Sequence, residues 1–112
     1  MSVTYTKKDV ARRTAEATGE KIYLTEKLVD GFFDTLREMM SEDEERVRIE
    51  IRNFGVFEVK PTKAKPKARN PRTNEEIYVP PRKKTHFKPG KLLREILKKP
   101  LSEWDNPGSV EK

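Results

Sequence analysis

Basic side chains are concentrated in one part of this sequence. Between residues 60 and 91, eleven lysines and arginines stand against two carboxylates, Glu75 and Glu76, which gives the segment a net charge of +9. The other 80 residues sum to −3. Ammonium and guanidinium groups gathered in this way bind polyanions, and nucleic acid is the commonest partner of such a segment. Composition alone also allows a solvated basic loop.

The sequence contains few of the residue types that enzyme active sites and metal sites require. The sequence has no cysteine, and His86 is its single histidine, so thiolate sites and every constellation that needs two histidines are excluded. Lysines and carboxylates are plentiful, but we find no nucleophile–base pair and no phosphate-binding glycine motif. We predict no catalytic residue, cofactor, metal site or small-molecule substrate. We expect His86 at the surface.

The size and composition favour a core shared with a second chain. The chain has 112 residues, of which 39% are charged and 33% apolar. This is a small apolar content for an independent domain, because small domains bury a smaller fraction of their surface than large ones. No apolar run approaches the length of a membrane span, and the N-terminus lacks the apolar stretch of a secretory signal. We therefore expect a cytoplasmic protein without a membrane partner.

Two helices are predicted before residue 41. Thr6 and Asp9 have the spacing of a capping box, and Gly19 ends a weakly apolar helical stripe. The second helix has a much stronger apolar face, and its start stays open between Ile22 and Thr25. This face is typical of core or a dimer interface. Its residues include Leu28, Val29, Phe32, Phe33, Leu36, Met39 and Met40.

The apolar period then changes from 3.6 to 2, which predicts strands. Residues 47–51 alternate between apolar and charged side chains, and a turn at residues 52–53 leads into a returning strand over residues 54–59. Gly55 marks a bulge or a close backbone approach. Helices followed by strands predict an α+β domain.

A long basic ribbon is predicted next, over residues 60–81, which we call the arm. Lysines alternate up to Arg69, a turn falls at Asn70–Pro71, and apolar residues alternate on the way back to Pro81. A disordered basic linker is the alternative. Residues 83–90 lead into a short helix over 91–97, which Pro100 ends. We predict a domain over residues 1–99 and a poorly ordered tail over 100–112.

Motif residues in the second half of the chain are shared with a known family. They are Phe54, Gly55, Phe57, Glu58, Val59, Arg69, Asn70, Pro71, Thr73, Glu76, Ile77, Pro80, Phe87, Lys88, Pro89, Gly90 and Lys91. In order and spacing the chain resembles the HU / integration host factor family of bacterial DNA-bending proteins, over about residues 6–98. Asn53, Ala68 and Asn74 stand where the family usually has glycine. Asparagine tolerates positive φ, so we expect the turn at Asn74 to survive.

The resemblance implies an intertwined α+β dimer with a helical base, an antiparallel sheet saddle and protruding β-ribbon arms that embrace DNA. A homodimer is expected, and a paralogous partner chain stays open. The predicted dimer core consists of Leu28, Val29, Phe32, Phe33, Leu36, Phe54, Phe57 and Phe87.

The resemblance also suggests a role for each group of polar residues. Pro71 is apolar and rigid, so it suits a wedge between base pairs in the minor groove, although it could also simply make the turn. Arg69, Asn70 and Arg72 would reach minor-groove acceptors. The predicted phosphate-binding residues are Lys60, Lys63, Lys65, Lys67, Arg82, Lys83, Lys84, Lys88, Lys91 and Arg94.

These inferences predict a nucleoid-associated architectural protein that bends or compacts double-stranded DNA with little sequence specificity. A site-preferring bender that resembles integration host factor and works with a paralogous partner is the main alternative. An RNA-binding protein would need aromatic side chains beside the basic ones, and the arm has only Tyr78. A protein that coats DNA without bending it has no use for a proline at the tip.

Overall fold

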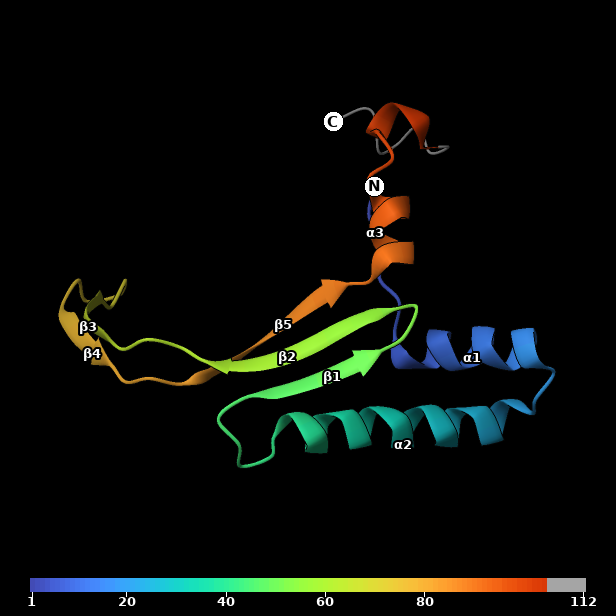
Figure 1. Ribbon diagram of the computed structural model, residues 1–112, viewed down its shortest axis with the longest axis horizontal. Helices are drawn as coiled ribbons and strands as arrows, with labels where there is room; N and C mark the ends of the chain where they lie inside the picture. Colours follow the sequence, from blue (N-terminus) through green and yellow to red (C-terminus); the bar gives the residue numbers. More distant parts are fainter. Residues whose placement is uncertain (105–112) are drawn as a thin grey trace. The chain divides into compact units, whose positions relative to one another are not determined.

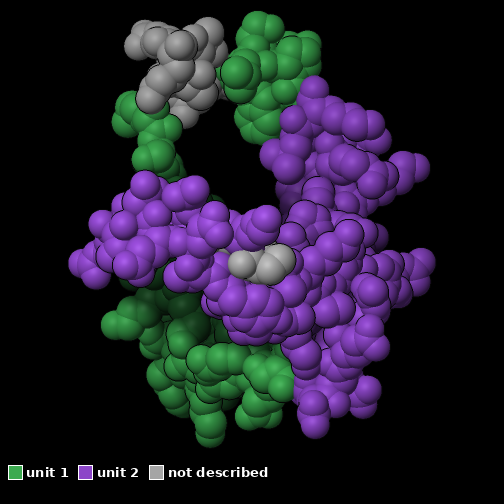
Figure 2. Space-filling view, turned by 90° about the vertical axis from the view of Figure 1, so that its left-hand side faces the viewer, with its two compact units in different colours: residues 1–41, 99–112 green, residues 42–98 purple. Residues whose placement is uncertain are grey.

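The computed structural model describes residues 1–104, apart from the side chains of Lys65, Pro66 and Ala68. The elements follow one another as helices, strands, a short helix and a final 3-10 turn (Figure 1). They form two compact units, residues 1–41 with 99–112 and residues 42–98, which are coloured separately in Figure 2. No helix in the described range has the length and apolar character that crossing a membrane requires.

The first unit contains a helical hairpin of α1 (Lys7–Thr18) and α2 (Ile22–Met40). The predicted capping box is confirmed, because the Thr6 hydroxyl accepts from the Asp9 N–H and Asp9 accepts from the Thr6 N–H at 2.9 Å. Gly19 ends α1 in the left-handed region at φ 76°. The open question about α2 is also answered. The helix begins at Ile22, so Thr25 lies inside it and donates its hydroxyl to the Lys21 carbonyl at 2.9 Å.

The second unit is built on a three-stranded antiparallel sheet in the order β1-β2-β5. The predicted hairpin is confirmed as β1 (Val47–Ile51) and β2 (Gly55–Pro61), with Asn53 in the turn at φ 67°. The sequence pattern did not predict the third strand, β5 (Lys83–Pro89). It pairs with β2 over seven residues without interruption, from Gly55–Pro89 to Pro61–Lys83.

Alternation along the strands gives this sheet one apolar face. Phe57 and Phe87 are paired across β2 and β5, and their ring centroids lie 4.9 Å apart. Phe54 joins them from the β1–β2 turn, with its centroid 5.2 Å from that of Phe87. Gly55 makes the predicted close approach, since a Cβ there would lie 2.5 Å from the Lys88 carbonyl oxygen. The phenylalanine cluster therefore depends on a residue without a side chain at position 55.

A single chain leaves much of its apolar surface uncovered. Among the described residues, the buried ones are few and mostly small: Ala11, Ala15, Thr25, Gly55 and Val59. By contrast, the exposed fractions of Leu28, Phe32 and Phe33 are 63%, 52% and 41%. Phe54 is also exposed, whereas Val29, Leu36, Phe57 and Phe87 are half-buried. None of the residues predicted as dimer core is therefore buried in a lone chain.

The remaining elements are short. The arm is confirmed as a ribbon of β3 (Lys65–Arg69) and β4 (Glu76–Val79), which rules out the linker alternative for these strands. Helix α3 (Lys91–Leu97) has the predicted bounds. In the predicted tail, a 3-10 turn at Leu101–Glu103 precedes Trp104, whose indole N–H donates to the Lys99 carbonyl at 2.8 Å. Residues 105–112 lie outside the described part, so the prediction for the tail is untested there.

Candidate nucleic-acid interface

The face of the sheet opposite the phenylalanines carries the charges. The strand register places Arg48, Glu58 and His86 in one row, and Lys60 beside Lys84 in the next. Lys88 lies on the same face. His86 is exposed, as predicted. Three of the predicted phosphate-binding lysines, Lys60, Lys84 and Lys88, are thus brought together on one surface.

Lys83 does not share this surface. It alternates to the apolar side of β5, opposite Pro61, and its Nζ donates to the Glu42 carbonyl at 3.3 Å. Lys91 and Arg94 are exposed on α3. The predicted set therefore divides between the sheet, the arm and α3. The side chain of Lys65 lies outside the described part.

A carboxylate to which the sequence pattern assigned no role, Glu58, lies at the centre of the charged face. Glu58 is 13% exposed, and its oxygens lie 3.0 Å from Lys88 Nζ, 3.0 Å from Arg48 Nη1 and 3.5 Å from Lys60 Nζ. The Lys88 ammonium first, and then the charges of Lys60 and Arg48, lower the pKa of this carboxyl against the opposing effect of burial. Arg48 also contacts Glu50, which raises the pKa of the guanidinium. The sheet cations are therefore partly neutralised and held in place.

The tip of the arm is a tightly bonded turn. Asn70 Oδ1 accepts from the Arg72 N–H at 2.9 Å, and the Asn74 N–H donates to the Asn70 carbonyl at 2.7 Å. Asn74 has φ 61°, so the prediction that asparagine replaces glycine in this turn is confirmed. Pro71 lies between these bonds and is exposed. The turn thus presents an apolar ring on a fixed backbone.

The two arginines predicted for the minor groove are placed differently. Arg72 is exposed beside Pro71. Arg69 is turned back onto the ribbon, where its Nη1 donates to the Asn74 carbonyl at 3.1 Å and its Nη2 lies 3.7 Å from Glu76. In this structure Arg69 therefore stabilises the turn, and any contact with a ligand would require these bonds to exchange.

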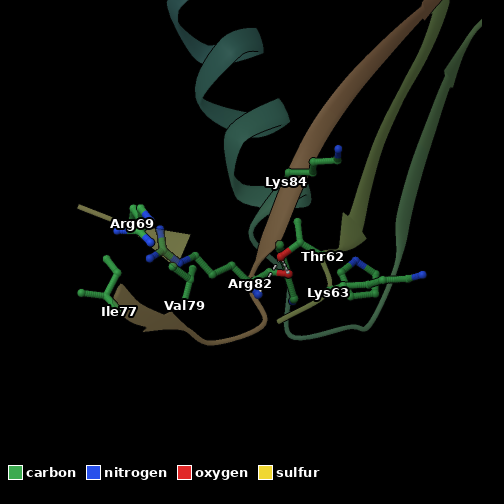
Figure 3. Close-up of a pocket in the computed structure, with 9 residues that line it drawn as sticks. Thr62, Lys63, Arg69, Ile77, Val79, Arg82 and Lys84 are labelled. Carbon is green, nitrogen blue, oxygen red and sulfur yellow. Dashed lines mark hydrogen bonds between the residues drawn. The ribbon is translucent and has the colours of Figure 1, made fainter. Parts of the chain in front are cut away.

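A basic concavity lies where the arm leaves the sheet (Figure 3). We call it the arm root. Its described lining combines five cations with three apolar residues and contains no carboxylate. The lining residues are Pro61, Thr62, Lys63, Arg69, Ile77, Val79, Arg82, Lys83 and Lys84. Thr62 and Arg82 are hydrogen-bonded to each other across the root. Sequence reasoning gave Thr62 no role.

Comparison with known proteins identifies the class to which this fold and charged surface belong. A family model described as "Bacterial DNA-binding protein" matches residues 5–98. The chain belongs to this family, whose relatives here are HU proteins and subunits of integration host factor. The family is architectural and not enzymatic.

The alignments with individual relatives cover nearly the whole length of those relatives. The DNA-binding protein HU of Thermotoga maritima is 37% identical over 93 residues, which cover 83% of this chain and 99% of that protein. The integration host factor subunit alpha of Hydrogenovibrio crunogenus is 36% identical over 89 residues, covering 80% of this chain and 88% of the relative. Among solved structures, an Anabaena HU–DNA cocrystal structure aligns with a TM-score of 0.75 and 27% identity, over 86% of this chain and all of that one.

Proposed function

We propose that this protein binds double-stranded DNA as a dimer and bends it by inserting Pro71 between base pairs from the minor groove. The observation that carries the proposal is the exposed proline at the apex of a hydrogen-bonded turn, at the end of a basic ribbon. A rigid apolar side chain in the minor groove unstacks a base step and kinks the duplex. Bacterial relatives named as DNA-binding proteins, and a neighbour solved with DNA, support the choice of ligand.

The basic side chains of the sheet and the arm would bind DNA phosphates on either side of the kink. Lys60, Lys84 and Lys88 lie on one face of the sheet, and exposed Lys67 lies on the arm. Phosphate neutralisation positions the duplex and makes affinity strongly dependent on salt. Because the minor groove hardly distinguishes A·T from T·A, we expect little sequence preference beyond deformability. Such a protein acts in the bacterial nucleoid, and therefore in the cytoplasm.

The dimer follows from what one chain leaves uncovered. Phe32 and Phe33 on α2 and Phe54 beside the sheet are exposed in a single chain, and a second copy would remove this apolar surface from water. Relatives include both HU proteins and integration host factor subunits. Because none of the described residues requires a different partner chain, we propose a homodimer, with a paralogous heterodimer as the alternative.

The function is tested by energy transfer between dyes at the two ends of a duplex shorter than the DNA persistence length of roughly 150 bp. We expect a large saturating rise in transfer at two chains per duplex. Pro71→Ala should still bind, through the phosphates, but should lose most of the rise. Pro100→Ala, which removes a proline outside the arm, is the matched control and should behave like the unaltered protein.

Two results would contradict the proposal. Salt-sensitive binding with no change in transfer would mean that the protein coats DNA without bending it. Preferential binding to single-stranded RNA in competition with duplex DNA would favour the RNA-binding alternative, for which Tyr78, 61% exposed, is the aromatic side chain on the arm.

A further inference from the structure

At the arm root, the side-chain hydroxyl of Thr62 takes the place of a backbone carbonyl as a hydrogen-bond acceptor. Its N–H donates to the Arg82 carbonyl at 2.6 Å, and its hydroxyl donates to the same oxygen at 3.2 Å. The Arg82 N–H donates in turn to the Thr62 hydroxyl oxygen at 3.0 Å (Figure 3). In a regular antiparallel ladder this N–H would bond to a backbone carbonyl. Here a side chain accepts the bond instead.

The neighbouring residues cannot take over this task. The sheet ladder ends at the pair Pro61–Lys83, and the arm ladder begins at Lys65–Val79. On the returning strand, Pro80 and Pro81 have no N–H to donate. Among the described residues, the three Thr62–Arg82 hydrogen bonds, one between backbone groups and two through the Thr62 hydroxyl, therefore connect the two strands in the gap between the ladders.

The direction of the arm matters because its charges and its tip must meet one duplex together. The described lining of the root includes five cations, among them Lys63, Arg82 and Lys84, and the exposed Pro71 lies at the far end of the ribbon. A ribbon that swings freely about the root spends only part of its time in the orientation that contacts DNA. The observed affinity is then reduced by that fraction.

We propose that Thr62 is a positioning residue, whose hydroxyl fixes the arm root and thereby holds the arm in its DNA-binding orientation. The proposal rests on the proposed DNA-binding function. Thr62 itself does not contact DNA in this role. It acts through Arg82 and the backbone, so the hydroxyl is required and the rest of the side chain is not.

Three variants separate the hydroxyl from the shape of the side chain. Thr62→Val keeps the branched shape and strand preference but removes the hydroxyl. Thr62→Ser keeps the hydroxyl and removes a methyl group. Thr85→Val makes the same change as Thr62→Val on β5, at a position where the hydroxyl has no hydrogen bond to any described residue, and is the matched control.

The first readout is hydrogen exchange of the Arg82 amide in the free protein. In Thr62→Val this amide should exchange about tenfold faster, the effect of losing one typical hydrogen bond. Thr62→Ser and Thr85→Val should keep the protection of the unaltered protein. The second readout is duplex affinity, which should fall about threefold to tenfold in Thr62→Val only.

The two measurements test different parts of the proposal, so different results would contradict each part. Unchanged Arg82 exchange in Thr62→Val, or equal loss in Thr62→Ser, would overturn the role of the hydroxyl. Faster exchange with unchanged affinity would overturn the link from the root to DNA binding. If no form of the protein binds a duplex, the proposed function fails, while the exchange data still decide whether the hydroxyl fixes the root. If Thr62→Val unfolds, Thr62→Ala replaces it in the same comparison.

Discussion

The sheet hairpin and the arm are both antiparallel, both basic, and both turn through an asparagine in the left-handed region, yet they are stabilised differently. The hairpin of β1 and β2 packs a phenylalanine cluster against one face, and β2 pairs with β5 over seven consecutive residues. The arm has three aligned pairs with a shift between Lys65 and Ala68. A two-stranded ribbon without an apolar layer is marginal in water. The sheet is therefore held by packing, and the arm by its turn and its root.

The two regions also differ in what their cations face. On the sheet, Glu58 holds Arg48, Lys60 and Lys88 around one carboxylate. In the described part of the β3–β4 ribbon, the ion pair is the longer contact between Arg69 and Glu76. A cation that lacks a protein partner is available to a phosphate, whereas one that is paired must exchange partners. We infer that the arm supplies most of the uncompensated charge and the sheet supplies a fixed platform.

The strongest test of this difference is Gly55→Ala in the sheet. A Cβ at this position would lie 2.5 Å from the backbone oxygen of Lys88 and 2.6 Å from the Phe87 ring. Because a backbone atom cannot move aside cheaply, we expect a loss of about 3 kcal/mol in the free energy of unfolding, the upper end for overpacking. Denaturant unfolding measures the change.

Gly31→Ala is the control for this substitution. Gly31 lies within α2, and a Cβ there would meet nothing within 4 Å. Replacing glycine by alanine inside a helix should stabilise the protein by up to about 1 kcal/mol. If Gly55→Ala were as well tolerated as Gly31→Ala, the close packing of the sheet would not be what stabilises this unit.

A smaller test places the same substitution in each hairpin. Asn53 and Asn74 both have positive φ, at 67° and 61°, and alanine in this region costs about 1 kcal/mol or slightly more. Asn53→Ala should lower global stability by about that amount, because the β1–β2 turn belongs to the packed sheet. Asn74→Ala should leave the global unfolding transition unchanged and speed amide exchange at the arm tip, which opens locally. Equal loss of global stability would mean that the arm and sheet unfold as one unit.

Much of the fold could be predicted because most elements carry their own periodicity. The apolar stripe of α2, the alternation of β1 and the bounds of α3 follow from local patterns. Strand β5 does not, because its residues Lys83–Pro89 contain one large apolar side chain, Phe87. Pairing with β2 imposes the strand, and that pairing joins residues far apart in the chain. The start of α2 was ambiguous because Lys21, its N-cap residue, makes no capping bond through its side chain.

The site was predictable to the same extent. The exposed Pro71 and the left-handed Asn74 follow from turn chemistry over a few residues. The roles of Glu58 and Thr62 were not predicted because their partners come from other strands: Lys88 lies on β5, and Arg82 lies twenty residues beyond Thr62. Arg69 was expected to face a ligand, and only the ribbon register reveals Glu76 beside it. Charge density was readable from the sequence, whereas the pairing of individual charges was not.

The smallest expected effect is electrostatic and comes from Glu58. The pKa of its carboxyl in the folded protein is lowered from the ordinary value of 4.5, with the Lys88 ammonium as the largest cause. A lowered pKa means that the folded state binds this proton less readily than the unfolded state. The stabilisation is therefore fully present above about pH 4.5 and is lost as the pH falls through the folded value. Glu58→Gln should flatten this part of the stability profile, as measured by thermal unfolding between pH 2 and 6.

Two further variants test which other carboxylates contribute to the pH dependence of the stability. The capping bonds from Thr6 also lower the pKa of Asp9, in the helical unit, so Asp9→Asn should remove a separate part of the same acid-side loss. In the arm, Glu76→Gln removes the carboxylate that contacts Arg69, and it should leave the global profile unchanged because the arm opens on its own. If Glu58→Gln also left the profile unchanged, the sheet would hold its cations no more firmly than the arm does. The electrostatic part of the contrast between the two regions would then be wrong, and their difference would rest on packing alone.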